Sequence, residues 1–170
     1  DWVNRQFITT EEAMPQYKTF ESGLDFIERN HTEDQWFLQI EAFDPHEPFY
    51  TQNEYKKLYP DDYHGKNLDW PDYGINQYGD AATKYDLWKD TMLIVNTDHG
   101  FMLGEKEWMG KNIQPMYEEL IHTPFFIYDP RNPIQGERRQ QLAQTVDIVP
   151  TLAEFFQIAP PEFMDGHSLT

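Results

Sequence analysis

An aspartate and a histidine stand side by side directly after a short apolar run in this sequence. Residues 92–95 are all apolar, Asn96 and Thr97 end the run, and Asp98 and His99 follow. A carboxylate offers a divalent cation a hard anionic oxygen, and a neutral imidazole offers it a nitrogen. Asp98 and His99 are therefore candidate metal ligands, which need partners from elsewhere to complete a coordination sphere. The alternative is an aspartate that caps the next turn beside a solvated histidine.

The apolar run predicts the strand that would position this pair. Such a run, bounded by polar residues, is typical of a strand buried on both faces, and we expect a strand over 91–97. In an open α/β sheet, ligands bind just beyond the carboxyl ends of the strands. Neighbouring side chains of a strand point to opposite faces, so the pair can share a ligand only if the backbone turns. Gly100 would permit that turn, because glycine tolerates unusual backbone angles.

Elsewhere, helical and strand patterns alternate along the chain. The predicted elements are helices over 15–30, over 116–121 and from Asp147 onward, and strands over 36–43, 91–97 and 124–128. Alternation of this kind predicts an α/β fold with a mixed, mostly parallel central sheet and helices on both faces. The proline-rich stretch 45–78 is expected to be an irregular loop that carries binding function or is mobile.

The segments around Asp98 and His99 resemble the sulfatase branch of the alkaline-phosphatase-like hydrolases. In that family a buried strand ends in Asp-His-Gly or Asp-Asn-Gly, and a Leu-Gly-Glu…Trp-Gly-Lys loop and a Thr-Pro strand follow. The matching segments are NTDHGFMLGEKEWMGKN, MYEELIHTPFFIYDPR, WFLQIEAFDPHEPF, QTVDIVPTLAEFFQI and MDGHSL. They cover about three quarters of the chain, in the order in which the family carries them.

The resemblance implies roles for four residues. It makes Asp98 and His99 metal ligands. It matches His46 to a histidine that contacts the sulfate or phosphate and the leaving-group oxygen, where an imidazole can donate a proton or stabilise negative charge. It matches Lys111 to a lysine that contacts the same anion. The residues alone leave open that His46 is an incidental surface histidine and Lys111 an ordinary surface lysine.

The neighbouring charges of the Lys111 loop carry a weaker signal. Glu105, Lys106 and Glu107 are expected to be solvated loop charges or contacts at a substrate rim rather than catalytic groups.

The implied activity is metal-dependent hydrolysis of sulfate esters, with a small-molecule or carbohydrate sulfate ester as substrate. Two alternatives remain: a phosphonate or phosphate ester hydrolase on the same scaffold, and a non-catalytic metal- or glycan-binding fragment. For the metal, oxygen-rich sites suit Ca²⁺ or Mg²⁺, while an imidazole ligand favours Mn²⁺ or Zn²⁺. The family precedent favours Ca²⁺.

The family's nucleophile is not recognisable among these residues. Relatives place a cysteine or serine, oxidised to formylglycine, far upstream, and this chain has no cysteine from which formylglycine could form. A long helix that the family carries is also missing near Lys84-Tyr85. We therefore expect residues 1–170 to be the central and C-terminal part of a single sulfatase-like α/β domain, with the N-terminal part, the small C-terminal subdomain and the nucleophile outside this chain. Alone, the fragment is expected to be inactive.

Composition narrows the class of partner. The net charge is −17, with 30 acidic and 13 basic residues. A nucleic-acid partner needs a basic footprint, so this charge argues against nucleic acid and against anionic membrane surfaces. An anionic substrate is still possible, because a metal and local cations override net charge. No membrane span or signal peptide is visible, and compartment and oligomeric state stay open.

Overall fold

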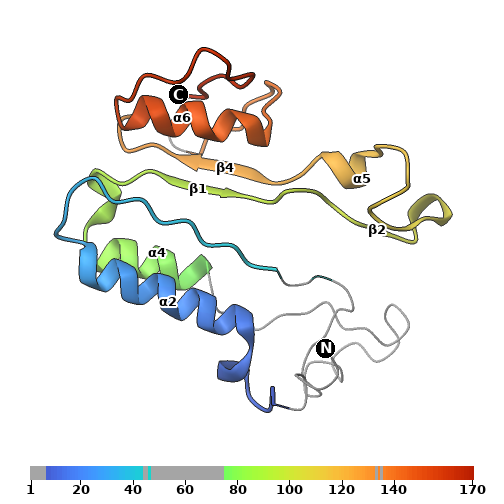
Figure 1. Ribbon diagram of the computed structural model, residues 1–170, viewed down its shortest axis with the longest axis horizontal. Helices are drawn as coiled ribbons and strands as arrows, with labels where there is room; N and C mark the ends of the chain where they lie inside the picture. Colours follow the sequence, from blue (N-terminus) through green and yellow to red (C-terminus); the bar gives the residue numbers. More distant parts are fainter. Residues whose placement is uncertain (1–6, 44–45, 47–74, 133, 135) are drawn as a thin grey trace. The chain divides into compact units, whose positions relative to one another are not determined.

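A computed structural model describes residues 7–43, 46, 75–132, 134 and 136–170 of the chain. The chain divides into two compact units, Asp1–Leu87 and Trp88–Thr170, and each is considered by itself (Figure 1). Within the described residues, no helix has the length and apolar character needed to cross a membrane. Most of the predicted irregular stretch 45–78 lies outside the described residues.

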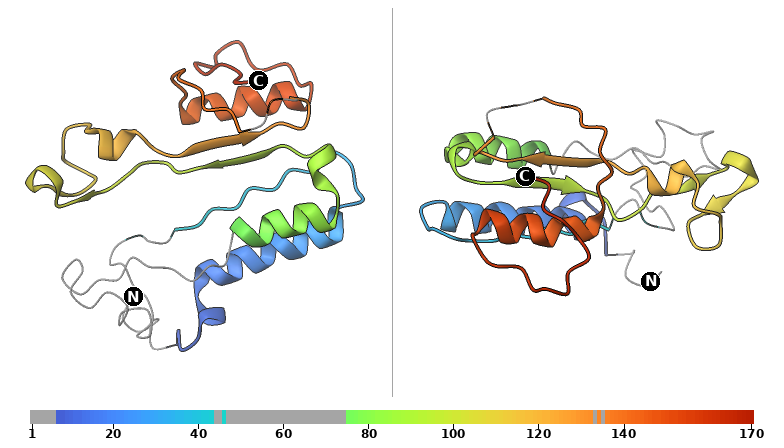
Figure 2. Two further views of the ribbon diagram at one scale, coloured as in Figure 1. Left: turned by 180° about the vertical axis from the view of Figure 1, so that it is seen from behind. Right: turned by 90° about the horizontal axis from the view of Figure 1, so that it is seen from above.

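Two helices form the centre of the first unit. Helix α2 (Pro15–Asn30) confirms the predicted helix over 15–30, and the proline at its first position already has the backbone angle that a helix requires. Helix α4 (Ile75–Lys84) packs beside it, as Figures 1 and 2 show. Tyr78 lies between them and donates a hydrogen bond of 2.7 Å to the Phe20 carbonyl. Burial raises the pKa of Tyr78 to about 12.

The helix α4 corrects the prediction of a loop that continues to Tyr78. The sequence INQYGDAATK places Ile75, Tyr78, Ala81 and Ala82 at helical spacing, but the repeat is short and two of its apolar residues are alanines, so it was overlooked. The helix is held by tertiary packing, because Tyr78 joins Ile27 and Leu87 in the buried core of this unit.

The predicted strand over 36–43 is wrong, since this segment forms no ladder with any described strand. Its alternating pattern is nevertheless real: Trp36, Leu38 and Ile40 pack against the core of the first unit, and the residues between them are exposed. An extended segment that packs one face on helices shows the same two-residue period as a strand. Periodicity therefore detected the extended conformation and could not supply a pairing partner.

The second unit is built on one antiparallel pair of strands. Strand β1 (Leu93–Asn96) pairs with β4 (Phe125–Tyr128), with Leu93 opposite Tyr128 and Asn96 opposite Phe125. Both predicted strands are confirmed, although each is shorter than expected. A second pair joins β2 (Met102–Leu103) to β3 (Met109–Gly110) as a hairpin that was not predicted.

The expectation of a mostly parallel sheet is wrong for the part of the chain that the structure describes, where both pairs are antiparallel. Parallel pairing needs a connection that crosses one face of the sheet, usually as a long helix. Here the connection from β1 to β4 contains the short hairpin and the four-residue helix α5 (Glu118–Ile121), which bring the chain back in the opposite direction. With a single neighbour, β1 is half-buried and not enclosed on both faces.

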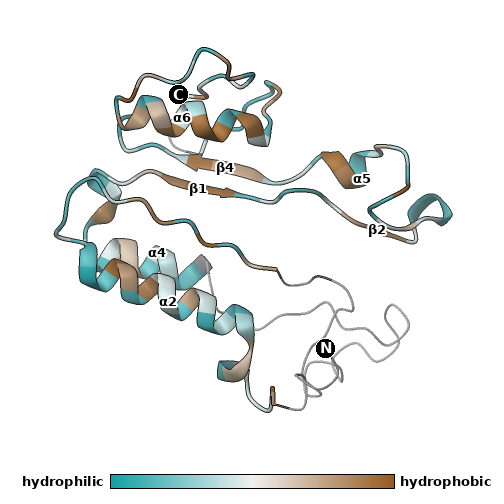
Figure 3. Cartoon of the chain, in the orientation of Figure 1, coloured by the Kyte–Doolittle hydropathy of each residue, from teal (hydrophilic) through white to brown (hydrophobic). Residues whose placement is uncertain are grey.

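Helix α6 (Ile148–Phe155) runs alongside this strand pair, and hydrophobic colouring extends over β1, β4 and α6 (Figures 1, 2 and 3). Residues just after β4 connect the two elements. The Arg131 guanidinium lies 5.0 Å from the centre of the Phe155 ring, and it also forms a two-pronged ion pair with the buried carboxylate of Asp129.

Asp147 does not cap α6 in the predicted way, because its backbone is already helical at the end of the 3₁₀ turn η5 (Thr145–Asp147). Its buried carboxylate accepts hydrogen bonds from the Gln144 N–H at 2.7 Å and the His167 N–H at 2.9 Å. These bonds hold the pKa of Asp147 below its ordinary value, with the His167 N–H contributing most. The carboxylate thus fastens residue 167 to the start of α6.

Two further contacts strengthen the same attachment. Thr151 is fully buried, and its hydroxyl donates to the Asp147 carbonyl at 2.6 Å and accepts from the Leu169 N–H at 3.0 Å. A Cβ on Gly166 would lie 2.1 Å from the Val146 carbonyl oxygen, so only glycine fits there. The sequence segments QTVDIVPTLAEFFQI and MDGHSL therefore pack against each other.

Replacement of Asp147 by alanine is expected to lower the free energy of unfolding by about 1–3 kcal/mol, because two N–H groups lose their acceptor. Denaturant unfolding of the full chain measures this change. Asp165→Ala, at an exposed aspartate nearby, is the matched control and should be nearly neutral.

Because folding lowers the pKa of Asp147, the contribution of its charged carboxylate to the free energy of unfolding is complete above a pH of about 4 and disappears as pH falls through the folded pKa. The gap between wild type and Asp147→Asn should therefore close in acid, and a gap that widens would contradict this role.

Candidate functional site

The backbone beyond β1 holds Asp98 and His99 in a defined arrangement. The His99 N–H donates to Asp98 Oδ1 at 2.8 Å, and His99 Nδ1 lies 2.8 Å from the Gly100 carbonyl oxygen. His99 Nε2 lies 3.3 Å from Asp98 Oδ2. The side chains are open to solvent, with 79% of Asp98 and 41% of His99 exposed. Both can therefore reach a ligand that approaches from outside.

This arrangement brings a ring nitrogen and a carboxylate oxygen close together. A carbonyl oxygen only accepts hydrogen bonds, so Nδ1 carries the proton and the neutral ring keeps its lone pair on Nε2. That lone pair faces a carboxylate oxygen, which is also an acceptor. A cation between the two atoms, or a second proton on the ring, resolves the conflict. An imidazole oriented by a backbone carbonyl is the usual form of a histidine metal ligand, so the donor set fits a divalent cation.

Asp98 is ionised at neutral pH, as a metal ligand must be. Partial desolvation raises the pKa of Asp98, but hydrogen bonds to the carboxylate, from the His99 N–H first and the Thr97 hydroxyl, and the charge of a protonated His99 ring together outweigh this effect and keep the pKa below its usual value. No group of three or more histidine, aspartate or glutamate side chains suited to a metal occurs in the described ranges. Asp98 and His99 would thus supply only part of a coordination sphere.

Gly100 is required for close approach and not for an unusual backbone angle, which corrects the expected reason for its presence. Its φ lies outside the left-handed region that favours glycine. Its N–H donates to the Leu120 carbonyl at 2.8 Å, and a Cβ at this position would lie 1.8 Å from the Glu119 carbonyl oxygen. The Asp98-His99 loop is therefore packed directly on α5.

The β2–β3 hairpin returns Lys111 towards this loop. In this ladder Met102 pairs with Gly110. The residues next to this pair are Phe101 and Lys111, and Phe101 is only two residues from His99 in the sequence. Behind Lys111, the buried side chain of Gln114 donates to the Met109 carbonyl at 2.8 Å and accepts the Ile113 N–H at 2.9 Å. Sequence reasoning missed Gln114, because a single glutamine in a polar loop gives no pattern.

Lys106 is exposed, in keeping with the predicted loop charge, and it is also paired. Its ammonium forms an ion pair with the Glu119 carboxylate and lies 4.6 Å from the centre of the Tyr117 ring. Because this ammonium donates to it, the Glu119 carboxylate has a pKa below its usual value. The hairpin is thus fixed to α5 as well.

His46 belongs to the first unit, where it follows the extended segment 36–43. Its side chain is exposed, and its N–H donates to the Phe43 carbonyl at 2.9 Å. The second unit therefore contains three of the four predicted residues, namely Asp98, His99 and Lys111, with Asp98 and His99 in contact, and His46 belongs to the first unit.

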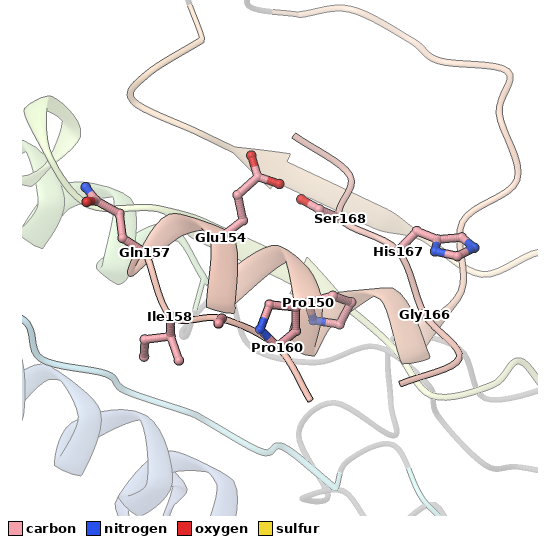
Figure 4. A pocket seen from close by; sticks show the side chains of 9 residues that line it. Pro150, Glu154, Gln157, Ile158, Pro160, Gly166, His167 and Ser168 are labelled. Atoms are coloured by element: carbon pink, nitrogen blue, oxygen red, sulfur yellow. The ribbon is translucent and has the colours of Figure 1, made fainter. Parts of the chain in front are cut away.

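A hollow of about 590 Å³ lies elsewhere in the second unit, between the C-terminal half of α6 and residues 166–168 (Figure 4). Its polar side chains are those of Glu154, Gln157, His167 and Ser168, and no lysine or arginine stands among its described lining residues. Without such a cation in its lining, this hollow does not suit a sulfate group.

Comparison with known proteins identifies the family. The family model described as Sulfatase matches residues 2–158. An arylsulfatase of Clostridium perfringens is 26% identical, over 99% of this chain and 44% of its own length. A multifunctional alkaline phosphatase superfamily protein of Trinickia caryophylli is 31% identical over 48% of this chain and 16% of its own length. The chain thus spans less than half the length of these relatives.

A solved structure agrees with these matches. It holds a protein in complex with its substrate D-glucosamine-2-N,6-O-disulfate, and it superposes with a TM-score of 0.51 at 29% identity, over 56% of this chain and 19% of the other. The alignment with the arylsulfatase extends over 211 residues, so that relative carries segments that these 170 residues lack. Because the family model covers nearly the whole chain, this chain belongs to the sulfatase family.

Proposed function

We propose that this chain supplies part of the active site of a metal-dependent hydrolase of sulfate esters. The observation that carries the proposal is the convergence of His99 Nε2 and Asp98 Oδ2, 3.3 Å apart, on one position that a cation would occupy. Lys111 enters the same loop system by way of the hairpin. The family model spans both units, which supports the proposal that all 170 residues are part of one sulfatase domain.

In this proposal, Asp98 and His99 hold a divalent cation, with Ca²⁺ first and Mg²⁺, Mn²⁺ or Zn²⁺ as alternatives. When bound, the cation supplies Lewis-acid stabilisation of the negative charge that develops on the transferred group. The Gly100 carbonyl keeps the Nδ1 proton in place, so that Nε2 stays available as a ligand. The exposed carboxylate of Asp98 is charged at neutral pH, as any aspartate whose pKa is not raised would be.

Lys111 and His46 would act on the ester itself. The Lys111 ammonium would contact the sulfate oxygens, and its chain position is held by the Gln114 amide behind it. His46 would donate a proton to the leaving-group oxygen or stabilise charge there. As the chain contains no cysteine, a cysteine-derived formylglycine nucleophile would come from outside these residues.

The proposed substrate is a sulfate ester of a small molecule or a sugar. An arylsulfatase and a complex with a disulfated glucosamine stand among the similar proteins and support both forms. The second candidate is a phosphate or phosphonate ester, which the similarity to a multifunctional alkaline phosphatase superfamily protein supports. Matched aryl sulfate, phosphate and phosphonate esters, assayed with the complete protein, distinguish the two by their kcat/KM values.

The metal assignment predicts that Asp98→Ala in the complete protein abolishes ester hydrolysis. It should also weaken metal binding by more than about 100-fold, because loss of a direct ligand costs at least as much as loss of a group that merely orients one. Metal content after dialysis, measured by elemental analysis, checks this result independently of turnover. Asp90→Ala, at an exposed aspartate beyond the other end of β1, is the control. Normal metal content in Asp98→Ala would refute the assignment.

The anion contacts predict that Lys111→Ala and His46→Ala each reduce kcat/KM for an aryl sulfate by about 100-fold or more, the loss typical of a donor that stabilises transition-state charge. Lys111→Arg should recover part of this loss, because it retains the charge. Lys89→Ala and His122→Ala, at other exposed positions, serve as controls and should be almost unaffected. Near-normal kinetics of either test variant would remove that residue from the site.

A further inference from the structure

The turn of the β2–β3 hairpin has an unfavourable backbone. Lys106 and Glu107, two successive residues with side chains, have φ values of 52° and 62°, and Gly104 before them has a φ of 121°. Residues with a Cβ rarely adopt the left-handed region, because Cβ then crowds the following carbonyl. Two in succession persist only where neighbouring interactions hold them in place.

Interactions within the turn account for part of that support. The Leu103 N–H donates to Glu105 Oε2 at 2.6 Å, and the Gly104 N–H donates to the Trp108 carbonyl at 3.0 Å. Neither bond fixes the hairpin relative to the rest of the unit. The buried side chain of Met102 anchors strand β2 in the unit. The turn itself is joined to α5 by the ion pair of Lys106 with Glu119, together with the approach of the Lys106 ammonium to the Tyr117 ring.

Glu119 also touches the loop that carries Asp98 and His99. Its carbonyl oxygen occupies the space that a side chain on Gly100 would take, and the following residue, Leu120, accepts the Gly100 N–H. One glutamate therefore contacts the Asp98-His99 loop through its backbone and the Lys111 hairpin through its carboxylate.

We propose that Lys106 and Glu119 form a positioning link, in which their ion pair sets the hairpin that carries Lys111 against the loop that carries Asp98 and His99. This inference rests on the proposed function of those three residues. Neither Lys106 nor Glu119 is a catalytic residue here, since each acts through the placement of Lys111.

The link predicts a selective effect. Loss of the ion pair frees the hairpin, whereas the Gly100–Leu120 hydrogen bond still holds the Asp98-His99 loop on α5. Binding of the anion should therefore weaken while metal binding stays unchanged. Exposed ion pairs contribute little to stability, so a large change in folding is not expected: 45% of the Lys106 side chain and 32% of the Glu119 side chain are exposed.

The test compares Lys106→Met, Glu119→Gln and the charge-swapped double variant Lys106→Glu/Glu119→Lys in the complete protein. Each single variant should raise KM for an aryl sulfate, and Ki for inorganic sulfate, by about 3- to 10-fold, as expected when contacting residues are uncoupled. The value of kcat and the metal content should change little, and the swapped pair should recover much of the loss. Lys89→Met and Glu107→Gln are matched controls.

Hydrogen exchange separates this inference from the proposed function. The Gly104 and Trp108 amides, which form the hydrogen bonds of the turn, should exchange faster in both single variants and recover in the swapped pair. If the wild-type protein hydrolyses no sulfate ester but the variants show this exchange pattern, the proposed function fails and the link stands. If the ester is hydrolysed and neither KM, Ki nor exchange changes in the single variants, the link is overturned.

Discussion

The second unit depends on how closely residue 100 approaches α5. The chain leaves β1, passes Asp98 and His99, and reaches a point where the Glu119 carbonyl oxygen leaves no space for a side chain. The Gly100 N–H then bonds to the Leu120 carbonyl at 2.8 Å. This contact fixes where the Asp98-His99 loop ends and where the hairpin begins. A larger residue at position 100 would displace α5, and the orientation of His99 would change with it, because the Gly100 carbonyl fixes its ring.

The same contact explains how a strongly acidic chain could bind an anion. With a net charge of −17, the average field of the protein repels a sulfate ester, so binding requires a local excess of positive charge. The proposed cation at Asp98 and His99 and the ammonium of Lys111 would provide it. Lys106, paired with Glu119, contributes no net charge and serves placement.

Sequence patterns predicted the elements whose residues carry their own signal. The amphipathic helix α2 and the apolar strands β1 and β4 appear close to the expected positions, because burial of their side chains decides their conformation. The motif around Asp98 and His99 led to the correct family, which the family model confirms.

The features that were missed depend on partners distant in the sequence. Helix α4 is short, and its packing through Tyr78 on the core does not follow from its weak local repeat. The segment 36–43 is extended as its alternation indicates, but the absence of a paired strand does not follow from that pattern. The helix predicted over 116–121 is confirmed as the shorter α5, but the hairpin before it was missed because two-residue strands have no periodicity to detect. The antiparallel direction of β4 follows from this short connection. Gly100 was recognised as important, but for backbone freedom, because a close approach is visible only once α5 is in place.

The central claim is that His99 Nε2 and Asp98 share one divalent cation. A crystal structure of the complete protein grown with Mn²⁺, with diffraction recorded at the manganese absorption edge, tests it most directly. The account predicts an anomalous peak within about 2.0–2.6 Å of both His99 Nε2 and an Asp98 carboxylate oxygen. A bound manganese elsewhere in the protein, with His99 Nε2 hydrogen-bonded to Asp98 through a ring proton, would contradict it.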